Sequence, residues 1–351
     1  MTISLVERFP GIDGLSRVAL CDLPTPLETI ESALSVGELW IKRDDLTSRA
    51  YGGNKVRKLE FLLGKALAEE RRAVITFGAY GSNHALATAV HARAVGLEPH
   101  VVLSPQAPTP YARATLLAHA GLGTRIHLVE GWDGAREAVR VKRALEAANG
   151  VEPLVIPMGG TNALGAAGYV NAAFEVADEM AEPGTIYVAG GTLGTAVGLA
   201  IGCAAVGWNR VTIQAIRVTP SEVANVAFAR TIAEETVALL READADFPAL
   251  AFGDLSLTLR DDWCEPGYGV VTPETMQAVA DMGQAGHRLE TTYTGKAFAA
   301  LTADASRGEL GGSSVLFWNT YNSAALPEPG PADTLPQRLQ DYIAECDRLF
   351  G

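Results

Sequence analysis

Two periods of apolar and polar positions alternate along the chain. Short runs rich in β-branched and aromatic residues predict strands buried on both faces, and longer stretches with apolar residues three and four apart predict helices. We expect strands near residues 39–43, 73–77, 100–103, 125–129, 185–188, 211–218 and 314–318. Helices are expected near 55–70, 84–95, 111–120, 134–148, 163–180, 195–206, 221–243, 273–285, 296–303 and after 336.

This alternation indicates βαβ units and a largely parallel sheet covered by helices on both sides. A chain of 351 residues is long enough for two domains of this α/β class. In such folds the ligand lies outside the carboxyl ends of the strands, so the loops that follow strands are the places to look for chemistry.

The first such loop is Tyr51-Gly52-Gly53-Asn54-Lys55, which precedes a helical pattern. Its glycines permit a tight turn, and Asn54 is a suitable N-cap. Lys55 then opens the helix, where desolvation or the nearby cations Arg57 and Lys58 would lower the pKa of its amine and make it nucleophilic. Taken alone, the segment also fits an ordinary loop-to-helix junction.

The residues before this turn include Asp44 and Asp45. We expect them to cap or solvate a turn and not to act as a paired acid and base.

Two more glycine turns follow predicted strands. The first ends in Ser82-Asn83-His84, a polar cluster. The second, 188–198, presents backbone N–H groups and threonine hydroxyls at a helix start, which suits a phosphate; a close strand-to-helix packing turn is the alternative. It lacks the Gly-Lys-[Ser/Thr] ending of a P-loop, and the next strand carries Gln214 and Arg217 in place of an acidic residue. A monophosphate is therefore favoured over a dinucleotide.

Composition narrows the class of protein. Apolar residues make up 48% and charged residues 20%, as in ordinary globular proteins, and the net charge of −13 disfavours nucleic acid as a partner. The four cysteines are far apart and no metal-ligand spacing occurs, which predicts reduced thiols in a cytoplasm and no metal. No signal-peptide pattern or long apolar run occurs, so we expect neither export nor membrane insertion.

A lysine, a polar cluster and a phosphate-binding turn on three loops would together suit pyridoxal 5'-phosphate. Five ordered segments carry a more specific resemblance: 52–62, Gly81-Ser82-Asn83-His84, 157–165, 267–270 and Tyr293-Thr294-Gly295-Lys296. They resemble the family of D-cysteine desulfhydrases and 1-aminocyclopropane-1-carboxylate deaminases, within the fold type II (tryptophan synthase β-like) pyridoxal phosphate enzymes. The resemblance spans about residues 24–319.

The resemblance implies two domains, each with a mostly parallel twisted sheet flanked by helices. Residues 1–58 and 167–351 would form a large cofactor-binding domain and residues 59–166 a small substrate-binding domain. Relatives are often homodimers, and a homodimer is the expected state here.

The resemblance also implies roles for single residues. Lys55 resembles the Schiff-base lysine that moves a proton at Cα, and Asn83 the partner of the cofactor's ring hydroxyl. Ser82, Asn83 and His84 would surround the substrate, with Ser82 as a candidate proton carrier. Tyr268 and Tyr293 would line the substrate pocket and exchange a proton with the leaving group, although both also fit core aromatic positions. The remaining cofactor contacts would come from Asn54, Thr192, Leu193, Gly194, Thr195, Thr294 and Thr320.

Two departures from the family pattern affect the expected substrate. Thr294 stands where the deaminase branch has a glutamate beside the pyridine nitrogen, which favours elimination over ring opening. Asn319-Thr320-Tyr321-Asn322 replaces a His-Thr-Gly-Gly turn of many relatives and would reshape the pocket while keeping a hydroxyl at Thr320.

The predicted activity is α,β-elimination on a small β-substituted amino acid, D-cysteine or a related compound such as cysteate. The products would be ammonia and a 2-oxo acid such as pyruvate. The alternatives are 1-aminocyclopropane-1-carboxylate deamination, β-replacement, and a binding protein that has lost the chemistry. The sequence leaves the enantiomer of the substrate open.

Overall fold

The computed structural model describes residues 3–32, 34–130 and 134–351 and contains two sheets. The larger sheet has the strand order β1 (Leu27–Ile30), β2 (Leu39–Lys42), β10 (Val315–Trp318), β7 (Thr185–Gly190), β8 (Thr212–Arg217) and β9 (Leu257–Arg260). The smaller has the order β5 (Arg125–Leu128), β4 (Glu98–Ser104), β3 (Ala73–Ala79) and β6 (Leu154–Val155). Apart from the antiparallel pair β1–β2, all neighbouring strands in these sheets are parallel. The predicted α/β class is confirmed.

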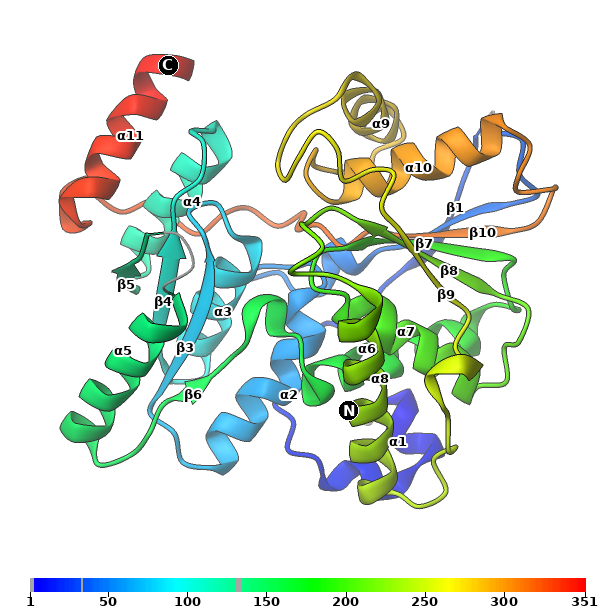
Figure 1. Cartoon of the computed structure of the whole chain (residues 1–351), viewed down its shortest axis with the longest axis horizontal. Coiled ribbons are helices and arrows are strands. Elements are labelled where there is room, and N and C mark those ends of the chain that lie inside the picture. Colours follow the sequence, from blue (N-terminus) through cyan, green and yellow to red (C-terminus); the bar gives the residue numbers. More distant parts are fainter. Residues whose placement is uncertain (1–2, 33, 131–133) are drawn as a thin grey trace.

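Helices cover both faces of the larger sheet (Figure 1). One face carries α6 (Ala163–Glu179), α7 (Gly194–Ala205) and α8 (Val226–Ala243), and the other carries α9 (Pro273–Gln284) and α10 (Thr294–Ser306). Successive residues of β7 enter opposite cores: Ile186 and Val188 pack on the first side, Tyr187 and Ala189 on the second. Such two-sided burial is the reason that these strands read as unbroken apolar runs.

The smaller sheet packs with α3 (Asn83–Ala94), α4 (Pro110–Gly121) and α5 (Gly134–Asn149). Between the two sheets runs α2 (Lys55–Ala68), and the short α1 (Ser4–Arg8) packs against α6. Single 3-10 turns lie at Pro10–Gly14, Asp44–Leu46, Met158–Gly160, Phe252–Asp254 and Ala332–Thr334.

The last helix, α11 (Gln337–Phe350), lies against α4 beside the smaller sheet (Figure 1). Its Leu339 and Ile343 are buried in one cluster with Val101 and Leu116. The expected large domain included this helix, but its apolar stripe is covered by the other part of the molecule. The division into residues 1–58 with 167–351 and residues 59–166 stays a prediction, and α11 packs against the smaller of these two parts.

The predicted strands and helices are all present, with ends displaced by a few residues. The strands that the sequence reading missed are β1, β6 and β9, each at an edge of its sheet and two to four residues long. An edge strand is half-solvated and mixes polar with apolar positions, so its pattern is weak.

Candidate active site

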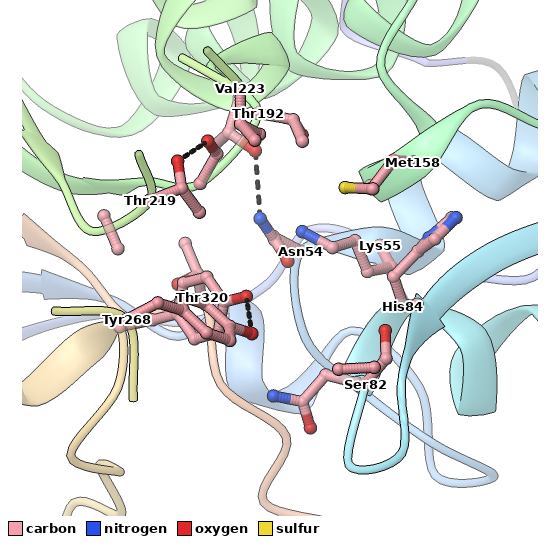
Figure 2. Close-up of a pocket in the computed structure, with 18 of the residues that line it drawn as sticks. Asn54, Lys55, Ser82, His84, Met158, Thr192, Thr219, Val223, Tyr268 and Thr320 are labelled. Atoms are coloured by element: carbon pink, nitrogen blue, oxygen red, sulfur yellow. Dashed lines mark hydrogen bonds between the residues drawn. The ribbon is translucent and has the colours of Figure 1, made fainter. Parts of the chain in front are cut away.

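A cavity of about 430 Å³ lies where the carboxyl ends of strands from both sheets meet (Figure 2). Its walls come from the turn before α2 and from the loops after β3, β4, β7, β8 and β10. The predicted site residues that line it are Asn54, Lys55, Ser82, Asn83, His84, Thr192, Leu193, Thr195, Tyr268, Tyr293 and Thr320. Segments spread over most of the chain are thus brought together. Gly194 and Thr294, the other two predicted cofactor contacts, are not among the residues that line the cavity.

Lys55 is the first residue of α2 and projects into this cavity (Figure 2). Burial lowers the pKa of its amine to about 8. Desolvation is the cause, and Arg57 plays no part, since its guanidinium is paired with Asp44 at 2.7 Å and Glu175 at 2.9 Å. An amine with this pKa is substantially neutral at mildly alkaline pH and can attack an aldehyde.

Asn54 was expected to cap α2, and this expectation was wrong. Its backbone is helical and its side chain makes no capping hydrogen bond. Its Nδ2 instead donates to Thr195 Oγ1 at 2.9 Å, which ties the start of α2 to the start of α7 (Figure 2).

Asp44 and Asp45 neither cap nor solvate an exposed turn, because both are fully buried. Asp44 accepts hydrogen bonds from Arg57, from the Tyr169 hydroxyl and from the Trp318 indole. This buried network joins the 3-10 turn Asp44–Leu46 to α2, α6 and β10. It therefore fixes the position of the helix that presents Lys55.

The turn before Lys55 requires its glycines. Gly53 has φ +92°, and a Cβ there would lie 3.0 Å from the carbonyl oxygens of Thr320 and Tyr321. Asn322 Oδ1 accepts a hydrogen bond from Gly52 N at 2.7 Å. Of the residues that replace the family's glycines, Asn322 thus supports the lysine turn, whereas Tyr321 lines the cavity.

The predicted phosphate turn leads from β7 into α7. Leu193 adopts a left-handed conformation (φ 62°), so that successive backbone N–H groups curve around one point at the start of a helix. A Cβ on Gly194 would lie 2.7 Å from Thr161 Oγ1 and 3.0 Å from Lys58 Nζ. Glycine is therefore needed because the backbone here approaches other groups closely.

Lys58 is a cation at this turn that the sequence reading treated only as a neighbour of Lys55. Its ammonium donates to Gly159 O at 3.1 Å and Thr161 Oγ1 at 3.2 Å, and burial lowers its pKa well below the usual value. Within the described residues no carboxylate pairs with it. A buried cation beside a ring of N–H groups fits a bound phosphate. Its position three residues after Lys55, on one face of a helix, was the signal in the sequence.

The polar cluster after β3 begins α3. Ser82 is the N-cap of this helix, since its Oγ accepts from Ala85 N at 3.2 Å. His84 Nε2 lies 2.7 Å from Thr76 Oγ1. Burial, together with Lys55 and Lys58, lowers the pKa of His84 well below its usual value. The imidazole is therefore neutral and can offer a hydrogen bond but no charge to a carboxylate.

Tyr268 and Tyr293 meet at the cavity wall with their hydroxyl oxygens 2.7 Å apart (Figure 2). Burial raises the pKa of both phenols. They therefore stay protonated at neutral pH and can pass a proton from one to the other. Lys296 Nζ donates to Gly267 O at 3.2 Å and holds the Tyr268 loop against α10.

Thr294 does not contact the cavity. It is fully buried, and its hydroxyl accepts from Glu290 N at 3.0 Å. Glu290, and not Thr294, lines the cavity. Its carboxylate accepts hydrogen bonds from the backbone N–H groups of Thr292, Tyr293 and Thr294. Burial raises the pKa of this carboxyl. The sequence reading missed Glu290 because it compared only the position directly after the tyrosine.

Comparisons with known proteins agree with this geometry. The family model described as pyridoxal-phosphate dependent enzyme matches residues 18–320. D-cysteine desulfhydrases of Klebsiella pneumoniae (strain 342) and Salmonella choleraesuis (strain SC-B67) are 35% and 34% identical to this chain, over 93% of it and 98% of each relative.

Solved structures share this fold. One described as an ACC deaminase homologue superposes with a TM-score of 0.77 at 30% identity, covering 92% of this chain and 96% of that one. A hydrogen sulfide-producing enzyme from Fusobacterium nucleatum, at 14% identity and TM-score 0.58 over 89% and 97% of the two chains, shares the fold.

Among the residues that the structure describes, no group of three or more His, Cys, Asp or Glu side chains is arranged to hold a metal ion. None of the described helices combines the length and apolar character needed to cross a bilayer. The comparisons lead to one assignment, with which the cavity around Lys55 is consistent: the chain belongs to the family of pyridoxal-phosphate dependent enzymes, in the group that contains the D-cysteine desulfhydrases.

Proposed function

We propose that this protein is a pyridoxal phosphate-dependent lyase that eliminates the β-substituent of a small amino acid such as D-cysteine. The observation that carries the proposal is that one cavity joins the Lys55 amine, with its lowered pKa, to the anion-binding turn at Gly191–Thr195. The names and identities of the relatives support the sulfur-containing substrate.

The donor set of the cavity fits this cofactor. Lys55 would hold the aldehyde carbon of the cofactor. Lys58 and the N–H groups of the Gly191–Thr195 turn would bind its phosphate, and Asn83 would bind its ring oxygen. Thr320 would face the pyridine nitrogen. When bound, pyridoxal phosphate serves as an electron sink for the charge left at Cα after proton loss.

The chain's own groups then divide the remaining work. The Lys55 amine removes the proton from Cα, and Ser82 and His84 hold the substrate carboxylate by hydrogen bonds. The Tyr268–Tyr293 pair gives a proton to the departing sulfur, which leaves as hydrogen sulfide. Overall, cysteine and water yield pyruvate, ammonia and hydrogen sulfide.

The proposal predicts the behaviour of Lys55→Ala. This variant should lack the visible absorbance band of the bound cofactor and should lose pyruvate release by at least a thousandfold. Lys65→Ala, which removes a half-exposed lysine from the same helix, is the matched control and should keep both. Full turnover by Lys55→Ala would overturn the assignment.

A second candidate, ring opening of 1-aminocyclopropane-1-carboxylate, is favoured by one observation. The residue at position 294 is a threonine, but Glu290 provides the cavity with a buried carboxylate. A carboxylate that kept the pyridine nitrogen protonated would strengthen the electron sink. Release of 2-oxobutyrate from this substrate, lost in Glu290→Gln, would establish the second activity.

The proposal includes a cytoplasmic homodimer. The four cysteines are separate thiols, as suits a reducing compartment. Light scattering should give twice the chain mass of 36.9 kDa.

A further inference from the structure

The carboxamide of Asn83, at the start of α3, is held by two phenols. Tyr51 Oη lies 3.0 Å from Asn83 Oδ1, and the Tyr111 hydroxyl donates to the same atom. The two phenol oxygens are 3.2 Å apart. A carbonyl oxygen has two lone pairs, so both are occupied here. The hydrogen-bonding group left on this side chain is its NH₂.

Both tyrosines are fixed by their own elements. Tyr51 belongs to the turn that leads to Lys55, and its carbonyl accepts a hydrogen bond from His91 Nε2 at 2.8 Å. Since His91 and Asn83 are on the same helix, Tyr51 is bound to α3 at two points. Tyr111 lies in the first turn of α4, which Thr109 caps through Ala112 N at 3.0 Å. The two phenols therefore connect the lysine turn, α3 and α4.

The surroundings keep these phenols as donors. Burial raises the pKa of both Tyr51 and Tyr111, so they remain protonated across the neutral range. The Tyr321 ring lies 6.2 Å from that of Tyr111, and the Arg288 guanidinium covers Tyr321 at 5.2 Å. Tyr321 and Arg288, from two further segments of the chain, thus border the cluster.

We propose that Tyr51 and Tyr111 are positioning residues that hold Asn83 with its N–H directed at the ring oxygen of the bound cofactor. The inference rests on the proposed function. A carboxamide rotated by half a turn would present its oxygen to another oxygen, and the contact would become repulsive. With both phenol donors bonded to Oδ1, Asn83 keeps the orientation in which it donates.

The test uses the full-length protein freed of cofactor and titrated with pyridoxal phosphate. In Tyr51→Phe/Tyr111→Phe the dissociation constant should rise by about tenfold, the effect of one or two lost hydrogen bonds. The pH midpoint of the visible band should also rise, because the ring oxygen loses a donor and retains more negative charge. Introduced into Asn83→Ala, the same two changes should have no further effect on either quantity.

Tyr80→Phe is the matched control. Tyr80 is buried close to the same loop, and within the described residues its hydroxyl has no hydrogen-bond partner. This variant should bind and titrate as the unmodified protein does. Effects of the two phenylalanines that persist in Asn83→Ala would show a general packing role and overturn the proposal, as would unchanged binding in Tyr51→Phe/Tyr111→Phe. If the unmodified protein gave no visible band at all, the proposed function itself would fail.

Discussion

Three side chains on the first turn of α2 have three different environments, although all are cations in the sequence. Lys55 enters the cavity, Arg57 is neutralised by Asp44 and Glu175, and Lys58 is buried at the phosphate turn. Sequence reasoning identified Lys55 because glycines precede it. It could not separate the roles of the other two, because these depend on carboxylates and hydroxyls contributed by distant segments.

The lowered pKa of Lys55 predicts how cofactor uptake depends on pH. The neutral amine attacks the aldehyde, so the rate of uptake should rise with pH and level off above the pKa. Because burial lowers this pKa from 10.5 to about 8, the midpoint should lie near 8. Stopped-flow absorbance with cofactor-free protein measures it, and N-acetyl-lysine with the same aldehyde is the reference. A protein midpoint equal to that of the free amine would contradict the desolvation argument.

At the level of single elements, the starts of α2 and α7 lie in contact, and both line the site. Asn54 bonds to Thr195 across them, and Lys58 reaches from the first turn of α2 to the groups around Gly194. The sequence predicted each helix start separately from its glycines. Their contact depends on how the two helices pack, which no local pattern encodes, and for this reason the role of Asn54 was misjudged.

This pairing predicts the behaviour of Lys58→Met. The affinity for pyridoxal phosphate should fall by roughly 10- to 100-fold, since a hydrogen bond to a charged group is lost. The affinity for pyridoxal, which has no phosphate, should change little. Thermal unfolding without cofactor should occur at an equal or higher temperature, because a buried unpaired ammonium is removed. Lys65→Met is the control on the same helix. Equal losses for both ligands would show that Lys58 does not contact the phosphate.

The whole molecule brings together loops that are up to about 270 residues apart in sequence, as the bond between Gly52 and Asn322 illustrates. The alternation of strands and helices was enough to predict parallel sheets and to place the site at their carboxyl ends. Glu290 and the tyrosines around Asn83 were not predictable in this way. They enter the site from a helix start and from loops whose mutual positions are set only when both sheets are packed.

The central claim is that Lys55 binds the cofactor covalently in a cavity whose phosphate turn lies beside Lys58. Borohydride reduction of the loaded protein, followed by peptide mapping, tests it most directly, because reduction makes the attachment permanent. The account predicts one modified peptide, with the cofactor on Lys55, and none from Lys55→Ala. Modification of Lys58 in place of Lys55, or of no lysine in a protein that still shows the visible band, would contradict it.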